Sequence, residues 1–360
     1  MRQGWHKSGK PLSVNVLSGA QRRQLIDTQQ VYQAWRAANE DGNRRFTGSM
    51  RWGERSGTNY LLRKIGKTET SLGPRNSETE AIYDAFIRGR ADNKDRLTSL
   101  SAKLDAFAPV NVAMGLGRVP TIAARIVREC DDRRLMGQHL VVVGTNAIYA
   151  YEVSAGVHVD SGLVATGDVD LLFDARRHIS LAVSGLGATG LIGILQKIDR
   201  SFAPTNSRSF RAANRDGYLV DFIRPEAKDP IRDLLPPALT NLPDDLEGAP
   251  IFGLAWLVNS PKLEAVAIDE RGYPVRLVVI DPRAFALHKA WVSRRQDREP
   301  IKAARDLEQA KAVAIIAMRY LSKSFDSPDL TALPKELREA APKLLQDIET
   351  PATGATKPNW

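Results

Sequence analysis

The fold that this sequence predicts depends on three short segments: VVVGTNAIYAYE (141–152), GDVDLLFD (167–174) and YLVDFI (218–223). Each contains a brief run of β-branched or aliphatic residues bounded by glycine or polar residues, which is typical of a buried strand. In the first segment the strand ends at Gly144 and a helix follows. We therefore expect an α/β protein of the α+β kind, in which these strands form a small mixed sheet.

Three aspartates occur where a buried strand should not tolerate charge. Asp168 and Asp170 are two residues apart, so on a strand both point to one face, about 6–7 Å apart along the chain. Asp221 lies in the middle of an apolar run, where an unpaired charge would cost several kcal/mol. Carboxylates on neighbouring strands also repel one another unless cations bind between them. Mg²⁺ is the natural candidate, because it is a hard cation that takes oxygen ligands.

Metal-assisted phosphoryl transfer assigns a role to each acid. Two Mg²⁺ ions held by Asp168 and Asp170 would bind a nucleoside triphosphate (NTP) and neutralise charge on the leaving pyrophosphate. Asp221 would complete the second metal site and help to deprotonate the attacking hydroxyl. Two structural alternatives remain open. Asp168 could be an acid of the turn that opens the strand, and Asp221 could be a buried acid paired with Arg211 or Arg224.

The turn after the first strand is a candidate phosphate-binding site. Gly144 ends the strand, and Thr145 or Asn146 can cap the helix that follows. A helix N-terminus has free N–H groups and a positive dipole end, so it favours phosphate. We expect Thr145 and Asn146 to donate hydrogen bonds to the β- or γ-phosphate of a nucleotide.

Together these residues resemble the signature of the polymerase-β-like nucleotidyltransferase superfamily: a small turn before a helix, a D-x-D strand and a third strand acid. The signature covers about a quarter of the chain. From about Met50 to Leu321 the chain more loosely resembles bacterial nucleotidyltransferase-like proteins related to the AbiEii and MenT toxins. Many members have Gly-Gly or Gly-Ser where this chain has Gly144-Thr145.

The resemblance implies further residues and partners. It implies that Lys289 contacts the triphosphate, and that Asp306 positions the triphosphate or a side chain beside it. It also implies an RNA acceptor, in particular tRNA, a toxin or phage-defence role, and an antitoxin protein as a partner. The alternative for Lys289 and Asp306 is a solvated charged face.

Charge is unevenly distributed along the 360 residues, whose formal net charge is +9. Residues 1–135 contain 24 Lys and Arg against 14 Asp and Glu, whereas residues 136–360 contain 27 against 28. A basic region beside a metal site suits a nucleic-acid acceptor. The alternative is an ordinary solvated basic face.

A β-hairpin is expected in the basic region, where two alternating runs flank Ser56-Gly57. Its cations and aromatic side chains could hold phosphates and stack bases, although a half-buried structural hairpin has the same pattern. The tentative nucleic-acid-binding residues are Arg51, Arg55, Arg63 and Lys64.

Composition favours a cytoplasmic protein with no membrane segment. Cys130 is the single cysteine, so an intrachain disulfide and a cysteine metal cluster are both excluded. The first ten residues, MRQGWHKSGK, lack the apolar core of a signal peptide. The longest uncharged stretch, 179–196, contains four glycines and is too short to span a bilayer.

We expect a helix over 18–39, a long helix that starts at a Ser77–Glu80 capping box and ends near Phe107, and a helix over 121–135. Later helices are expected from Asp281-Pro282, over 303–321 and over 334–348. The expected domains are a basic helical and hairpin region (1–135), a nucleotidyltransferase core (136–281), a C-terminal helical region (282–350) and a flexible tail (351–360).

The leading hypothesis is a Mg²⁺-dependent nucleotidyltransferase that moves a nucleotidyl group from an NTP to tRNA or another RNA. Transfer to a protein hydroxyl, as in AMPylation, remains open. A catalytically silent nucleic-acid-binding module and a nuclease that uses the same acids are the rivals from other classes.

Overall fold

The structure is a computed structural model of the chain. It describes residues 14–174, 190–227, 240, 242 and 245–349. The expected tail, the first thirteen residues and residues 179–189 of the uncharged stretch therefore lie outside the described residues.

The chain forms two compact units. The helical hairpin unit comprises Gly19–Gly117 and Arg271–Pro274, and the rest of the chain forms the sheet unit. By this division residues 121–132 belong with the sheet, although the sequence boundary at residue 135 had assigned them to the basic N-terminal region.

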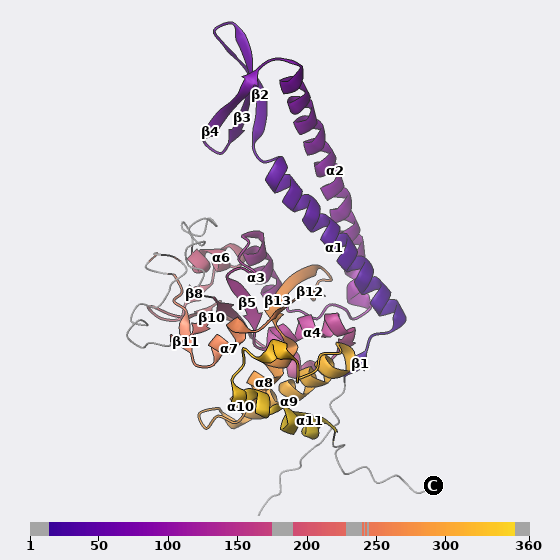
Figure 1. Ribbon diagram of the computed structural model, residues 1–360, viewed down its shortest axis with the longest axis vertical. Helices are drawn as coiled ribbons and strands as arrows, with labels where there is room; N and C mark the ends of the chain where they lie inside the picture. Colours follow the sequence, from indigo (N-terminus) through magenta and orange to yellow (C-terminus); the bar gives the residue numbers. More distant parts are fainter. Residues whose placement is uncertain (1–13, 175–189, 228–239, 241, 243–244, 350–360) are drawn as a thin grey trace, which may run out of the picture. The chain divides into compact units, whose positions relative to one another are not determined.

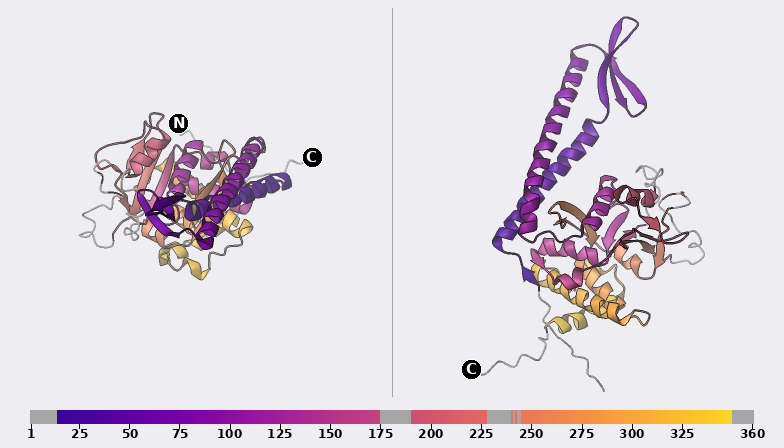
Figure 2. Two further views of the ribbon diagram at one scale, coloured as in Figure 1. Left: turned by 90° about the horizontal axis from the view of Figure 1, so that it is seen from above. Right: turned by 180° about the vertical axis from the view of Figure 1, so that it is seen from behind.

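The helical hairpin unit consists of two long helices and a small sheet (Figures 1 and 2). The helices α1 (Gly19–Arg45) and α2 (Ser77–Ala113) lie side by side. The strands β2 (Ser49–Arg55), β3 (Thr58–Ile65) and β4 (Thr68–Pro74) form an antiparallel sheet in the order β2-β3-β4. The expected hairpin is confirmed as β2 and β3, whereas β4 was not predicted.

Both long helices extend beyond their expected ends. The helix α1 continues through Gly42. The helix α2 continues past Pro109, where Asn111 is buried and donates a hydrogen bond to the Gly272 carbonyl at 2.8 Å. The capping box also differs from the expected one: the Asn76 side chain accepts from the Thr79 N–H, and the Thr79 hydroxyl accepts from the Asn76 N–H. Tertiary contacts therefore outweigh the local stop signals of glycine and proline.

The sheet unit is built around an eight-stranded mixed sheet in the order β12-β13-β5-β7-β10-β9-β8, with β11 also paired to β10. The strands β7 and β10 are parallel, and β5 runs antiparallel to β7. The bounds of the strands are β5 (Leu140–Val143), β7 (Asp168–Phe173), β8 (Ala203–Pro204), β9 (Arg211–Ala213), β10 (Leu219–Pro225), β11 (Ala249–Ile251), β12 (Lys262–Ile268) and β13 (Pro274–Ile280).

Helices cover both faces of this sheet, with α3 and α6 on one side and α4, α8 and α9 on the other (Figure 1). The region after β13 is helical, so the expected α/β fold with a helical C-terminal region is confirmed. The expected helix over 303–321 is α9 followed by a π-helical turn, and the one over 334–348 is split into α10 and α11. The bounds are α3 (Thr121–Asp132), α4 (Ile148–Ala155), α5 (Ser161–Val164), α6 (Gly190–Ile198), α7 (Leu254–Asn259), α8 (Pro282–Val292), α9 (Pro300–Ile315), η5 (Ile316–Tyr320), η6 (Pro328–Leu330), α10 (Lys335–Glu339) and α11 (Ala341–Glu349). A two-stranded sheet joins β1 (Asn15–Val16) to β6 (Val157–His158).

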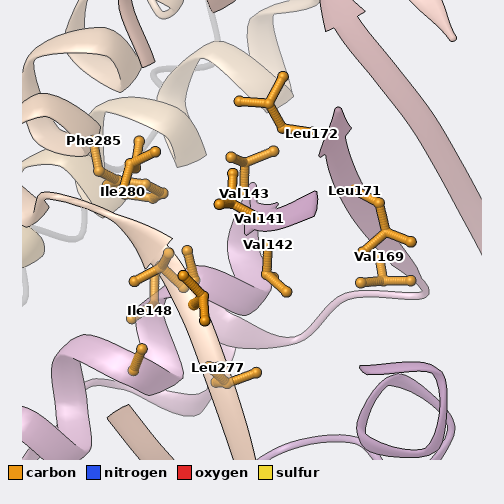
Figure 3. Packing of buried hydrophobic residues seen from close by; sticks show 14 of the residues in the cluster. Val141, Val142, Val143, Ile148, Val169, Leu171, Leu172, Leu277, Ile280 and Phe285 are labelled. Atoms are coloured by element: carbon orange, nitrogen blue, oxygen red, sulfur yellow. The ribbon is translucent and has the colours of Figure 1, made fainter. Parts of the chain in front are cut away.

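The central strands are apolar on both faces, as Figure 3 shows for the valines and leucines of β5 and β7. The register pairs Val142 with Leu171 and Val141 with Leu172, so successive residues alternate between the two faces. All four are buried. Their continuous apolar pattern is typical of strands covered on both sides, and it makes the polar residues at the start of β7 exceptional.

Candidate active site

The sheet brings the three predicted acids together. Asp168 and Asp170 lie on β7, and the parallel register places Asp221 of β10 beside Asp170. Neighbouring strands are about 4.8 Å apart, and residues in register point to the same face. All three carboxylates therefore share one face at the beginning of two adjacent strands.

Gly144 lets the backbone approach these acids closely. It follows β5, whose last residue, Val143, pairs with Asp170. Its backbone has φ 63° and ψ −155°, a region that is almost confined to glycine. A Cβ atom at this position would lie 1.9 Å from Oδ2 of Asp170. A glycine is required here both by the backbone and by the neighbouring carboxylate.

The environment of Asp170 disfavours its charged form. Burial, and then the nearby carboxylates of Asp168 and Asp221, raise its pKa to about 7, although Lys289 and Arg211 oppose this shift. A carboxylate with this environment gains strongly from a cation placed beside it.

Polar side chains fix the backbone and the carboxylate of Asp168. The Thr166 hydroxyl donates to Asp168 Oδ1, and Asn146 Nδ2 donates to the Asp168 carbonyl at 2.7 Å. Oδ1 of Asn146 is buried and has no hydrogen-bond partner among the described residues. Asn146 thus links the glycine turn to the first acid.

Neither Thr145 nor Asn146 caps the helix as expected. The short 3₁₀ helix η1 (Thr145–Ala147) has Gly144 as its N-cap, and α4 starts from Ala147; neither end has a side-chain cap. The Thr145 hydroxyl instead accepts a hydrogen bond from Gln309 Nε2 at 3.2 Å. Because both side chains are buried in tertiary contacts, they cannot fold back onto the helix end.

Arg211 binds the third acid directly. Its Nε donates to Oδ1 of Asp221 and its Nη2 donates to Oδ2, both at 2.6 Å. This was one of the two pairings considered from the sequence. Arg224, the other candidate, donates to the Gly248 carbonyl.

Lys289 and Asp306 also meet, on helices α8 and α9. Lys289 Nζ donates to Asp306 Oδ1 at 2.6 Å, and Arg298 Nε donates to Oδ2 at 2.7 Å. Asp306 is buried. The carboxylate therefore orients two cations at once, and Lys289 is close enough to influence Asp170.

Arg298 could not be picked out from the sequence, because nothing in its local pattern distinguishes it from neighbouring arginines. Of these neighbours, Arg295 pairs with Asp297 and lies over the Trp291 ring. The pKa of His288, which precedes Lys289 on α8, is lowered to about 3, chiefly by burial and then by Lys289.

A hollow of about 460 Å³ lies where β7 and β10 begin, and none of the three acids lines it. Its lining includes Gly167, which precedes Asp168, and Tyr218, which precedes β10. The Tyr218 hydroxyl is buried without a hydrogen-bond partner among the described residues. Arg125 and Arg215 line this hollow together with Asp199 and Asp216, so the formal charges of these four side chains cancel.

Two of the three acids offer the kind of oxygen ligands that Mg²⁺ takes. Asp168 and Asp170 supply hard oxygen ligands on one face of the strand. A cation beside Asp170 would lower its raised pKa. Within the described part of the chain, however, no three His, Cys, Asp or Glu side chains form a metal-binding group. The two β7 acids fit a metal ion, whereas Asp221 is engaged by Arg211.

The four residues expected to bind nucleic acid lie in the helical hairpin unit. Arg51 donates to both oxygens of Glu69. Arg63 donates to the Arg45 carbonyl and lies over the Phe86 ring. These two therefore have structural partners, whereas Arg55 and Lys64 are exposed.

The mixed sheet, the acidic strand pair and the glycine turn define the chain as an α/β protein of the nucleotidyltransferase class. A family model described as "Nucleotidyltransferase" matches residues 121–334, more than half of the chain. The chain belongs to this family, and it is accordingly an enzyme of the nucleotidyltransferase type. Neither the curated proteins nor the solved structures contain a match to it. Among the described residues, no helix has the length and apolar character needed to cross a bilayer.

Proposed function

We propose that the protein uses Mg²⁺ to transfer a nucleotidyl group from an NTP to a hydroxyl group of RNA, with tRNA as the acceptor. The observation that carries this proposal is the placement of Asp168 and Asp170 on one face of β7, against the backbone of Gly144. Hard ligands beside a glycine turn suit a metal-bound triphosphate.

In this reaction the acceptor oxygen attacks the α-phosphorus, and the bond to the pyrophosphate oxygen breaks. Bound Mg²⁺ would supply positive charge to the triphosphate and the departing pyrophosphate. Asp168 and Asp170 would hold the ion, and Asp221 would accept the hydroxyl proton at a lone pair that its two hydrogen bonds to Arg211 leave free.

Neutral and cationic side chains position the triphosphate. Lys289, oriented by Asp306, donates to the phosphates. Thr145 and Asn146 directly follow Gly144 in the chain, and we assign them to phosphate contacts. These assignments follow the preference of phosphate for N–H and O–H donors.

The basic helical hairpin unit supports an RNA acceptor. Its segment 19–117 contains 16 Lys and Arg against 11 Asp and Glu. Arg55 and Lys64 of its sheet are exposed and are proposed to contact RNA phosphates. The resemblance to AbiEii- and MenT-type proteins supports a toxin or phage-defence role in the cytoplasm, together with an antitoxin partner.

The test uses the full chain, each NTP labelled at its α-phosphate, Mg²⁺ and total tRNA or cell extract. Label should move onto RNA with the wild type, and should be lost in Asp168→Ala/Asp170→Ala. Glu226→Gln, which removes an exposed acid just after β10, is the matched control and should retain transfer.

Other outcomes would replace the proposal with a rival. Label on protein alone would indicate AMPylation, and RNA cut without NTP would indicate a nuclease. Salt-sensitive RNA binding with all NTP left intact would indicate a silent binding module.

A further inference from the structure

Strand pairing places Arg211 directly opposite Asp221. In the antiparallel register of β9 and β10, Arg211 is the partner of Asp221, and in the parallel register of β7 and β10, Asp221 is the partner of Asp170. Residues in register point to one face. The guanidinium is therefore held at the acid face by the sheet itself.

The backbone of Arg211 is also fixed. Its N–H donates to Ser209 Oγ at 3.0 Å, and its carbonyl accepts from the Ser209 hydroxyl at 2.7 Å and from the Thr205 N–H at 3.0 Å. The guanidinium lies 5.5 Å from the centre of the Phe210 ring. These contacts restrict where the arginine can reach.

The pair is bidentate, and it engages both oxygens of the third carboxylate. Both oxygens of Asp221 accept from Arg211 at 2.6 Å, and the Asp221 side chain is only 10% exposed. Fork-to-fork pairs of this kind are among the stronger ion pairs. A second divalent ion at Asp221 would have to approach against the positive charge of the guanidinium.

The local charge balance needs only one divalent ion. The acids Asp168, Asp170, Asp221 and Asp306 face three basic groups, since Arg211 pairs with Asp221 while Lys289 and Arg298 pair with Asp306. This set has a formal net charge of −1, so one divalent cation makes it positive, as a triphosphate site requires.

We propose that Arg211 takes the place of a second metal ion: it occupies Asp221, limits the centre to one divalent cation on Asp168 and Asp170, and supplies the second positive charge itself. The inference rests on the proposed function, because it refines the metal site of that reaction. It departs from the two-ion arrangement that the sequence had suggested.

The test counts bound ions by electron paramagnetic resonance of Mn²⁺, titrated into the full-length protein without nucleotide. The wild type should bind one ion. Arg211→Ala should bind a second ion, with an affinity at least about tenfold above any weak second binding in the wild type, since an opposite charge shifts a carboxylate's pKa by one to three units. Arg211→Ala/Asp221→Asn should return to one ion.

Arg211→Gln serves as a second variant that fills the same space without charge, and it should also bind two ions if it folds. Near-ultraviolet circular dichroism checks the fold of each variant. Two ions in the wild type, or one in both Arg211 variants, would overturn the inference while leaving the proposed reaction intact. No ion in any variant would overturn the metal site of the proposed function together with the inference.

Discussion

Replacing Gly144 with alanine is the most demanding test of the site geometry. Alanine at this position would have to adopt a backbone conformation that costs a residue other than glycine about 1–3 kcal/mol. Its Cβ would also lie 1.9 Å from Oδ2 of Asp170, and overpacking of this kind costs about another 1–3 kcal/mol. We expect the free energy of unfolding to fall by about 2–6 kcal/mol in urea denaturation, and nucleotidyl transfer to be lost.

A control variant separates the two contributions. Gly217 has φ +79°, but no atom lies within 4 Å of its Cβ position. Gly217→Ala should therefore show only the backbone cost, about 1–3 kcal/mol. In an Asp170→Ala background, Gly144→Ala should cost no more than this control. The reasoning is refuted if Gly144→Ala and Gly217→Ala destabilise the wild-type protein equally.

Three further predictions concern charge and capping. Because the pKa of Asp170 is raised to about 7 from 3.8, the folded state retains a proton that the unfolded state loses. The free energy of unfolding should therefore fall as pH rises from about 4 to 7. Urea titrations of Asp170→Asn should show a smaller fall over the same pH range. The same dependence of unfolding free energy on pH in the variant and the wild type would contradict this. Asp306→Ala leaves Lys289 without its buried partner. This variant should destabilise the protein by about 3–5 kcal/mol and raise the KM for NTP. A stable variant with a normal KM would contradict the role assigned to Asp306. Asn76→Ala removes the capping box with Thr79 and should cost about 1 kcal/mol in denaturation of the helical hairpin unit, with no loss expected from Ser77→Ala.

Several features could be predicted from contiguous residues. The strands of Asp168, Asp170 and Asp221 were recognisable because short apolar runs between glycine or polar turns are typical of buried strands. The hairpin at Ser56-Gly57 was equally clear, since both residues have positive φ, as a tight hairpin turn requires. Local pattern was enough for these elements.

Local signals failed where distant contacts opposed them. Gly42 and Pro109 should end helices, but each lies inside one. Beyond Pro109, Asn111 accepts a hydrogen bond from Gln24 and donates one to Gly272, so packing sustains the helix. The strand β4 was missed because nearly all of its residues are exposed and it has no apolar alternation.

The sequence by itself determined which residues are chemically unusual: three carboxylates in apolar strands and a glycine before a helix. It did so because hydrophobic periodicity and turn chemistry depend on neighbouring residues. Only the tertiary structure decided the partners. Arg211 reaches Asp221 through the pairing of two strands, and Arg298 reaches Asp306 where α8 and α9 pack together. An ion pair forms between whichever charges the fold brings within hydrogen-bonding distance, and that distance in space is not encoded in the spacing along the chain.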